Sequence, residues 1–214
     1  MESFINFIKS ALTKPLPGQS AQQQMMPSLS DKSRFSLEAK AAARPGAVMV
    51  LFYKKNETLY FPLIERSTYD GVHAGQISLP GGKMDLSDHD LEQTALRETE
   101  EEIGIPSSKI QVLGKLSELY IIASNFNVLP VVGYINEPFS FEKDDHEVAS
   151  IVEANVADLL NDEVQKQTVL QVSNYSIDAP YFDINGHVVW GATAMMLAEL
   201  KTLLQQHPDS SRLV

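Results

Sequence analysis

A run of apolar, β-prone residues from Ala47 to Tyr53 constrains the fold of this chain more than any other feature. A continuous apolar run of this kind is typical of a strand that is buried on both faces. The turn-forming stretch 54–57 follows it, and Leu59 to Ile64 is a second β-prone segment. Two such segments joined by a short turn predict a β-hairpin.

The remaining patterns predict more strands and two well-marked helices. Strand signals occur in five segments, of which the last two are weaker: 110–116, 129–135, 148–154, 169–172 and 188–190. The strongest helix is expected at 91–103, where Ser87 and Asp88 offer N-cap side chains and Gly104 ends the helix. A second helix is expected at 192–206. Strands mixed with a few helices, without regular βαβ alternation, predict an α+β domain with layers of helix, sheet and helix.

The first 44 residues differ from the rest of the chain. Four apolar side chains at helical spacing predict a short amphipathic helix: Phe4, Ile5, Ile8 and Leu12. We expect residues 1–44 to form a helical extension that packs on the body of the protein, which residues 45–214 form. The alternative is a helix for a partner protein or a membrane surface, and a homodimer completed by this extension is also compatible with the sequence.

Composition excludes several classes of function. The chain of 214 residues has 17 basic and 28 acidic side chains and a net charge of -11, which excludes a protein that coats nucleic acid by neutralising phosphates. A small phosphorylated ligand is still compatible if metal ions mediate the contact. The absence of cysteine excludes thiolate nucleophiles and thiolate zinc sites. The apolar runs are too short to cross a membrane and the first residues do not resemble a secretory signal, so we expect a cytoplasmic protein.

The helix expected at 91–103 carries a cluster of carboxylates. At about 100° per residue, Glu98, Glu101 and Glu102 share one face, whereas Glu100 lies roughly opposite. Like charges three and four residues apart destabilise a helix, and a bound cation converts their repulsion into ligation. Carboxylate oxygens suit hard ions such as Mg²⁺ or Mn²⁺. The alternative is a solvated acidic face without a ligand.

Glycines and prolines just before this helix favour the metal site over the solvated face. The stretch 71–82 predicts a long irregular loop that ends in Gly81 and Gly82. A glycine backbone lets a carbonyl or an N–H group approach an ion or a phosphate with no side chain in the way.

Residues 82–105 read GKMDLSDHDLEQTALRETEEEIGI and resemble the Nudix box, G-x5-E-x7-R-E-U-x-E-E-x-G-U, in which U is a bulky aliphatic residue. The half from Arg97 onward matches, except that Thr99 stands at an aliphatic position. The first half is one residue longer than the pattern, so its acidic position falls on Asp88 or on His89.

The one-residue expansion resembles the coenzyme A pyrophosphatase-like branch of the Nudix hydrolases. Further resemblance to that branch lies in four stretches: 16–27, 66–82, 131–134 and 190–194. The stretch before the box usually carries an arginine where this chain has Gly71, which leaves other diphosphate substrates open.

The resemblance implies a Nudix-type α/β/α sandwich with a mixed central sheet over residues 45–214. It also implies metal-dependent hydrolysis of a diphosphate bond in a nucleoside diphosphate derivative. The expected substrate is coenzyme A or an acyl-CoA, which would give 3′,5′-ADP and 4′-phosphopantetheine. The alternatives are another nucleotide (ADP-ribose, a dinucleoside polyphosphate or an oxidised nucleotide) and a sensor that binds a nucleotide without cleaving it.

The resemblance also assigns roles to residues of the site. The implied ligands of Mg²⁺ or Mn²⁺ are Glu98, Glu101, Glu102 and the carbonyl of Gly82. Glu101 is either a third ligand or the base that takes the proton of the attacking water, and Glu147 is a more distant candidate base. Arg97 is expected to orient a carboxylate of the box by an ion pair. Substrate binding is expected of residues close to the box: Arg66, His73, Gln76, Gly81 and Lys83.

Overall fold

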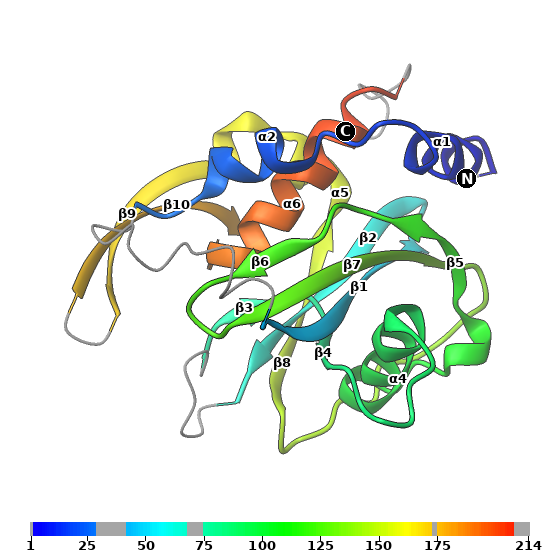
Figure 1. The fold of residues 1–214 in the computed structure, drawn as a ribbon. Helices are drawn as coiled ribbons and strands as arrows, with labels where there is room; N and C mark the ends of the chain where they lie inside the picture. Colours follow the sequence, from blue (N-terminus) through cyan, green and yellow to red (C-terminus); the bar gives the residue numbers. More distant parts are fainter. Residues whose placement is uncertain (1, 29–41, 68–74, 173–174, 208–214) are drawn as a thin grey trace.

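The computed structural model describes residues 2–28, 42–67, 75–172 and 175–207 (Figure 1). The α-helices are α1 (Glu2–Leu12), α2 (Gly18–Gln22), α4 (Leu91–Ile103), α5 (Val156–Leu160) and α6 (Gly191–Leu204). Short 3-10 turns are η1 (Gln23–Met25), η3 (Ser107–Lys109) and η4 (Asp162–Val164). The strands are β1 (Arg44–Lys55), β2 (Thr58–Arg66), β3 (Ile77–Ser78), β4 (Gly81–Lys83), β5 (Gln111–Lys115), β6 (Leu119–Ile121), β7 (Phe126–Ile135), β8 (Val148–Asn155), β9 (Gln165–Val172), β10 (Tyr175–Ile184) and β11 (His187–Trp190).

Strand β1 lies at the centre of an eight-stranded mixed sheet. It pairs in parallel with β7, from Arg44 opposite Phe126 to Tyr53 opposite Ile135. Two antiparallel partners share its other edge, β4 near the start of β1 and β2 near its end. Strands β3 and β8 pair with β2, and β5 and β6 pair with β7. Strand β1 therefore has hydrogen-bonded neighbours on both edges, and it places the short strand β4 beside the middle of the sheet.

Helices cover both faces of this sheet, so the chain forms the expected α/β/α sandwich (Figure 1). On one face, Met49 and Leu51 of β1 pack with Ala95 and Ile103 of α4. On the other face, Phe52 packs in a cluster that includes side chains of α1, α5 and α6. Successive side chains of a strand point to opposite faces, so the middle of β1, from Ala47 to Tyr53, must be apolar at every position to fill both cores.

A smaller sheet of three antiparallel strands, in the order β11–β10–β9, follows the central sheet in sequence. Figure 1 shows β9 and β10 extending to one side of the molecule, with α6 between them and the central sheet. Phe182 and Ile184 of β10 belong to the same core cluster as α6. Strand β10 has no counterpart in the sequence prediction, which found only the weaker signals near β9 and β11.

Most predicted elements are confirmed, and two details are wrong. The hairpin, the three stronger strands and both predicted helices are present within a few residues of their expected bounds. The predicted loop 71–82 contains β3 and the first two residues of β4, because Ile77–Ser78 pairs with β2 and Gly81–Lys83 pairs with Gly46–Val48 of β1. The N-cap of α4 is Asp90, whose carboxylate accepts a hydrogen bond from the Gln93 N–H, in place of Ser87 or Asp88.

The amphipathic spacing near the N-terminus corresponds to α1, whose buried side chains are Phe4, Ile5, Ile8 and Ala11. The division of the chain into residues 1–44 and 45–214 stays a prediction. In the described part of the chain, no helix has the length and apolar character that a membrane crossing requires.

Candidate active site

The acidic helix α4 and the glycine strand β4 meet at the side chains of Glu98 and Glu102. The backbone N–H of Gly81 donates a hydrogen bond of 2.7 Å to Oε2 of Glu102. Gly82 lies so close to Glu98 that an added Cβ atom would be 2.6 Å from its Oε2. Gly81 has a φ of +148°, and a Cβ atom there would be 2.3 Å from the carbonyl oxygen of Ala47. The two glycines therefore bring bare backbone against two carboxylates.

Both of these carboxylates are withdrawn from solvent. Glu102 is 1% exposed, and burial raises its pKa to about 8, although the Gly81 N–H and the Arg66 charge act in the opposite direction. Burial also raises the pKa of Glu98. Two carboxylates that ionise reluctantly are suited to a bound cation, because a nearby positive charge stabilises the ionised form.

Arg66, the last residue of β2, connects Glu102 to a neighbouring cavity. Its Nη1 lies 3.3 Å from Oε1 of Glu102. The pairing of β2 with β8 is irregular between Glu65 and Arg66. Arg66 also lines the cavity described below, so it belongs both to the carboxylate group and to the cavity wall.

Arg97 is the organising cation of α4. Its Nε and Nη2 donate hydrogen bonds of 3.0 and 2.9 Å to the two oxygens of Asp88. Its Nη1 lies 2.8 Å from an oxygen of Glu98 and 2.8 Å from an oxygen of Glu101. Hydrogen bonds from Arg97 hold the pKa of Asp88 well below its ordinary value. The geometry confirms that Arg97 orients carboxylates of this segment, and it identifies Asp88, and not His89, as the acid paired with it.

Glu101 is not gathered with Glu98 and Glu102 in this structure. Its side chain is 58% exposed, and Arg97 holds its carboxylate. The shared face that the sequence predicted for three glutamates therefore brings two of them to the glycine strand. The role of Glu101 as base or third ligand stays a prediction.

Three further predicted groups have different placements. Glu147 is exposed, directly before β8, and its charge contributes to the raised pKa values of Glu98 and Glu102. The carbonyl oxygen of Gly82 faces β1, where a Cβ atom on Gly46 would be 2.7 Å from it. The roles of Glu147 as base and of the Gly82 carbonyl as ligand stay predictions. His73 lies outside the described residues.

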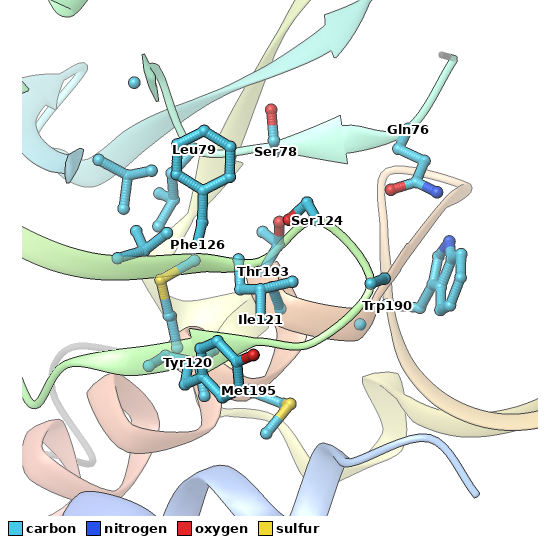
Figure 2. Close-up of a pocket in the computed structure, with 18 of the residues that line it drawn as sticks. Gln76, Ser78, Leu79, Tyr120, Ile121, Ser124, Phe126, Trp190, Thr193 and Met195 are labelled. Atoms are coloured by element: carbon cyan, nitrogen blue, oxygen red, sulfur yellow. The ribbon is translucent and has the colours of Figure 1, made fainter. Parts of the chain in front are cut away.

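A cavity of about 490 Å³ borders the glycine strand (Figure 2). Five residues that the sequence assigned to the site line it: Arg66, Gln76, Gly81, Gly82 and Lys83. Among the described residues of its wall, Arg66 and Lys83 are the only charged ones. The rest of the wall is largely apolar, and Figure 2 shows several of its members: Leu79, Tyr120, Ile121, Phe126, Trp190 and Met195.

Sequence reasoning missed most of this apolar wall. Met26 and Trp190 lie in stretches that resemble the coenzyme A pyrophosphatase-like branch, and that resemblance was the available signal. Ile121, Phe126 and Met195 carried none. An apolar residue on a strand or helix has the same pattern whether it faces a packed core or a cavity.

The donor set fits the predicted divalent ion. Of the residues that the structure describes, no three His, Asp or Glu side chains are grouped closely enough to enclose a metal. Mg²⁺, however, is commonly held by one or two carboxylates together with waters and substrate phosphates. Glu98 and Glu102, one helical turn apart and both with raised pKa values, provide such a pair beside the cavity.

Comparisons with known proteins agree with this arrangement. Residues 43–171 match the family model of the NUDIX domain. An uncharacterised Nudix hydrolase, NudL of Yersinia pestis (strain Pestoides F), is 35% identical over 170 residues, which cover 75% of this chain and 79% of the relative. NudL of Yersinia enterocolitica serotype O:8 is 34% identical over 142 residues, which cover 64% of this chain and 70% of the relative. The crystal structure of RenU, a Nudix hydrolase from M. smegmatis, superimposes with a TM-score of 0.54 at 18% identity, covering 78% of this chain and 88% of that one, and it supports the fold alone.

The matched region includes β1, the glycine strand and the whole of α4 with Arg97, Glu98 and Glu102. Nudix hydrolases act on nucleoside diphosphate derivatives and generally use divalent metal ions. The family match, the NudL relatives and the sandwich architecture together show that this chain belongs to the Nudix hydrolase family, pyrophosphohydrolases that act on phosphorus-containing anhydrides.

Proposed function

We propose that this Nudix hydrolase cleaves the diphosphate bond of coenzyme A or an acyl-CoA and releases 3′,5′-ADP and 4′-phosphopantetheine. The observation that carries the proposal is the polarity of the cavity. Its charged wall residues are Lys83, at the end of the glycine strand, and Arg66, beside Glu102. The remaining wall is largely apolar. A diphosphate joined to a long uncharged arm matches this polarity, with the phosphates at the basic end and the arm along the apolar wall.

The residues around the glycine strand divide the work of hydrolysis. Glu98 and Glu102 would hold Mg²⁺ or Mn²⁺, which supplies charge neutralisation of the diphosphate and activation of water. Arg66 and Lys83 bind and orient the phosphate oxygens. Glu101 and Glu147 are the two candidates for the base that accepts the proton of the attacking water. Arg97 fixes the rotamers of Glu98 and Glu101 through its ion pairs.

A substrate panel with product analysis tests the proposal. The purified protein is incubated with Mg²⁺ or Mn²⁺ and coenzyme A, acetyl-CoA, ADP-ribose, a dinucleoside polyphosphate or an oxidised nucleotide, and the products are identified by mass. We expect 3′,5′-ADP with 4′-phosphopantetheine or its acylated form, at a higher kcat/KM than for the other substrates.

Preferred cleavage of another member of the panel would overturn the assignment to coenzyme A. That result would agree with Gly71, which stands where the related signature has an arginine. Binding without turnover of any member would instead favour a nucleotide sensor. The preferred metal, the cytoplasmic location and the homodimer stay predictions.

A further inference from the structure

Part of the apolar wall comes from segments that flank the Nudix domain. Residues 18–28 run from α2 through η1 to Ser28, and we call them the N-terminal strap. Met26 and Pro27 of the strap line the cavity together with Ile177 and with residues of β11 and α6. All of these residues lie outside 43–171, the region that matches the family model. The family domain supplies the carboxylates, and the flanks supply this side of the cavity.

One buried carboxylate ties the start of the strap to the C-terminal helix. Glu199 of α6 is 0% exposed. Its Oε1 accepts hydrogen bonds from the backbone N–H groups of Gly18, at 3.1 Å, and Ser117, at 3.2 Å. Its Oε2 accepts a hydrogen bond of 2.9 Å from Nε2 of Gln22. A buried carboxylate with three specific donors fixes the segments that provide them, because leaving any of these groups without a partner is unfavourable.

The other end of the strap is fixed as well. The Ser28 N–H donates a hydrogen bond of 2.9 Å to the carbonyl oxygen of Asp178 on β10, in an isolated β-bridge. Met25, just before the cavity residues, is fully buried in the core. Between these anchors, Met26 is 37% exposed and contributes to the cavity wall. Its place in the wall is therefore set by contacts on both sides of it.

We propose that the N-terminal strap is a substrate-recognition element and that Glu199 is its positioning residue. The proposal rests on the function proposed above. Met26, together with Met195 and Met196 of α6, contacts the uncharged arm of the substrate while the phosphates lie near Arg66. Thioether side chains are flexible and polarisable, so they adapt to apolar groups of different length, as an arm with or without an acyl group requires.

The fluorescence of Trp190 can measure ligand binding in this cavity when no substrate is turned over. Trp190 is the single tryptophan of the chain and lines the cavity, so a ligand that enters should change its fluorescence. The metal-free protein is titrated with 4′-phosphopantetheine, with 3′,5′-ADP, with intact coenzyme A and with ADP-ribose. Metal is omitted so that no turnover occurs and each titration gives a dissociation constant.

Three variants of the full chain are compared with the wild type. Met26→Ala shortens the wall side chain. Glu199→Gln keeps the size of the side chain but replaces one acceptor oxygen with an NH2 group, so the side chain can no longer accept hydrogen bonds from all three of its donors. Gln23→Ala is the matched control, because Gln23 is exposed on the same strap and is absent from the cavity wall. Thermal unfolding and circular dichroism show whether each variant is folded.

We expect Met26→Ala and Glu199→Gln to weaken binding of 4′-phosphopantetheine and coenzyme A about five- to tenfold. The dissociation constant of 3′,5′-ADP should be unchanged in both variants. Gln23→Ala should bind every ligand with the dissociation constant of the wild type. A loss of fold would weaken every ligand alike, so the contrast between the two fragments separates positioning from general destabilisation. If Glu199→Gln is unfolded, the comparison of dissociation constants between Met26→Ala and the wild type decides the test.

Equal dissociation constants for wild type and Met26→Ala, with every ligand that changes the Trp190 signal, would overturn the proposal. Failure to see any signal change across the ligands would overturn it too. If only ADP-ribose changes the signal, and Met26→Ala weakens it, the strap is still a recognition element and the assignment to coenzyme A is wrong.

Discussion

Among the acidic residues of α4, Glu102 is the one that contacts both the glycine strand and Arg66. Its side chain is buried, its Oε2 accepts a hydrogen bond from the Gly81 N–H, and its Oε1 lies 3.3 Å from Nη1 of Arg66. A carboxylate in this setting does not improve packing, because burying its charge is unfavourable. Its chemistry is explained if a cation shares the site when the enzyme works.

Replacing Glu102 with glutamine is expected to lower kcat about 100-fold or more and to leave the fold intact, because the amide keeps the size but not the charge that holds a metal. Steady-state kinetics with saturating Mg²⁺ measures the effect. Glu100→Gln is the matched control, since Glu100 is exposed and accepts a hydrogen bond from Ser107 away from the glycine strand. Near wild-type turnover of Glu102→Gln would contradict the ligand role.

The raised pKa of Glu102 also predicts how stability depends on pH. Its pKa is about 8 in the folded protein, whereas 4.5 is the ordinary value of a glutamate, which we take for the unfolded chain. The folded state therefore binds more protons between these values, and ionisation of Glu102 lowers stability as the pH rises through that window. Without metal, Glu102→Gln should melt a few degrees above the wild type at pH 8.5 and close to it at pH 4.5.

Thermal unfolding in a chelating buffer at several pH values measures this difference. Addition of Mg²⁺ should raise the melting temperature of the wild type at pH 8.5 more than that of the variant. A difference that is constant with pH would show that the Glu102 carboxyl is not the group responsible.

At the scale of elements, the short strand β4 determines how close the sheet comes to the acidic helix. Its two glycines differ in what surrounds them. Added side-chain atoms at Gly82 would meet the carboxylate end of the Glu98 side chain, whereas at Gly81 they would meet the backbone of Ala47 and Val48. Substitution at the two positions should therefore separate activity from stability.

Gly82→Ala is expected to fold and to lose about 100-fold in kcat, because the methyl group displaces the Glu98 carboxylate. Gly81→Ala is expected to lose stability first, by about 2 kcal/mol or more, since its clash is with backbone and its φ is unfavourable for alanine. Denaturant unfolding and steady-state kinetics on both variants give the comparison. Equal effects of the two substitutions on both measurements would contradict this description of β4.

The elements differ in how well the sequence predicts them, for local reasons. Helix α4 was predicted to the residue because its apolar period and the C-terminal Gly104 are local signals. Strands β3 and β4 were missed because such short strands form only by pairing with distant partners. Strand β10 was missed because Asp178 and Asp183 interrupt its apolar residues, and aspartate is depleted in strands.

In the candidate site, too, the sequence predicts what depends on local spacing and misses what depends on tertiary contacts. Glu98 and Glu102 followed from helical spacing and from the resemblance of their segment to the Nudix box. The exposure of Glu101 did not follow, because its ion pair with Arg97 depends on side-chain rotamers. The cavity wall depends on which strands and helices meet, and spacing along the chain does not contain that information.

At the scale of the whole molecule, the N-terminal helix is part of the main core. Ile8 of α1 is 0% exposed, in the same cluster as Phe52 and Phe61 of the central sheet. The ring of Phe4 packs edge-on against Phe52, with 5.3 Å between centroids. These contacts show that α1, the helical part of the predicted extension, packs on the central sheet.

Ile8→Ala is expected to lower the free energy of unfolding by about 3 kcal/mol, because it leaves a cavity in a well-packed cluster. Urea unfolding followed both by Trp190 fluorescence and by far-UV circular dichroism measures the loss. The two signals should change together if α1 and the sheet unfold as one unit. Ser10→Ala, on the exposed side of α1, should stay within about 0.5 kcal/mol of the wild type.

The hydrogen bond from Gly18 to Glu199 joins residues that are 181 positions apart. During synthesis on the ribosome, α2 therefore leaves the exit tunnel long before its partner on α6 exists. The acidic helix and both edges of β1 can assemble earlier, as soon as β7 has emerged. In a nascent chain, Glu98 and Glu102 can thus reach the glycine strand before the cavity wall that contains Met26 is complete.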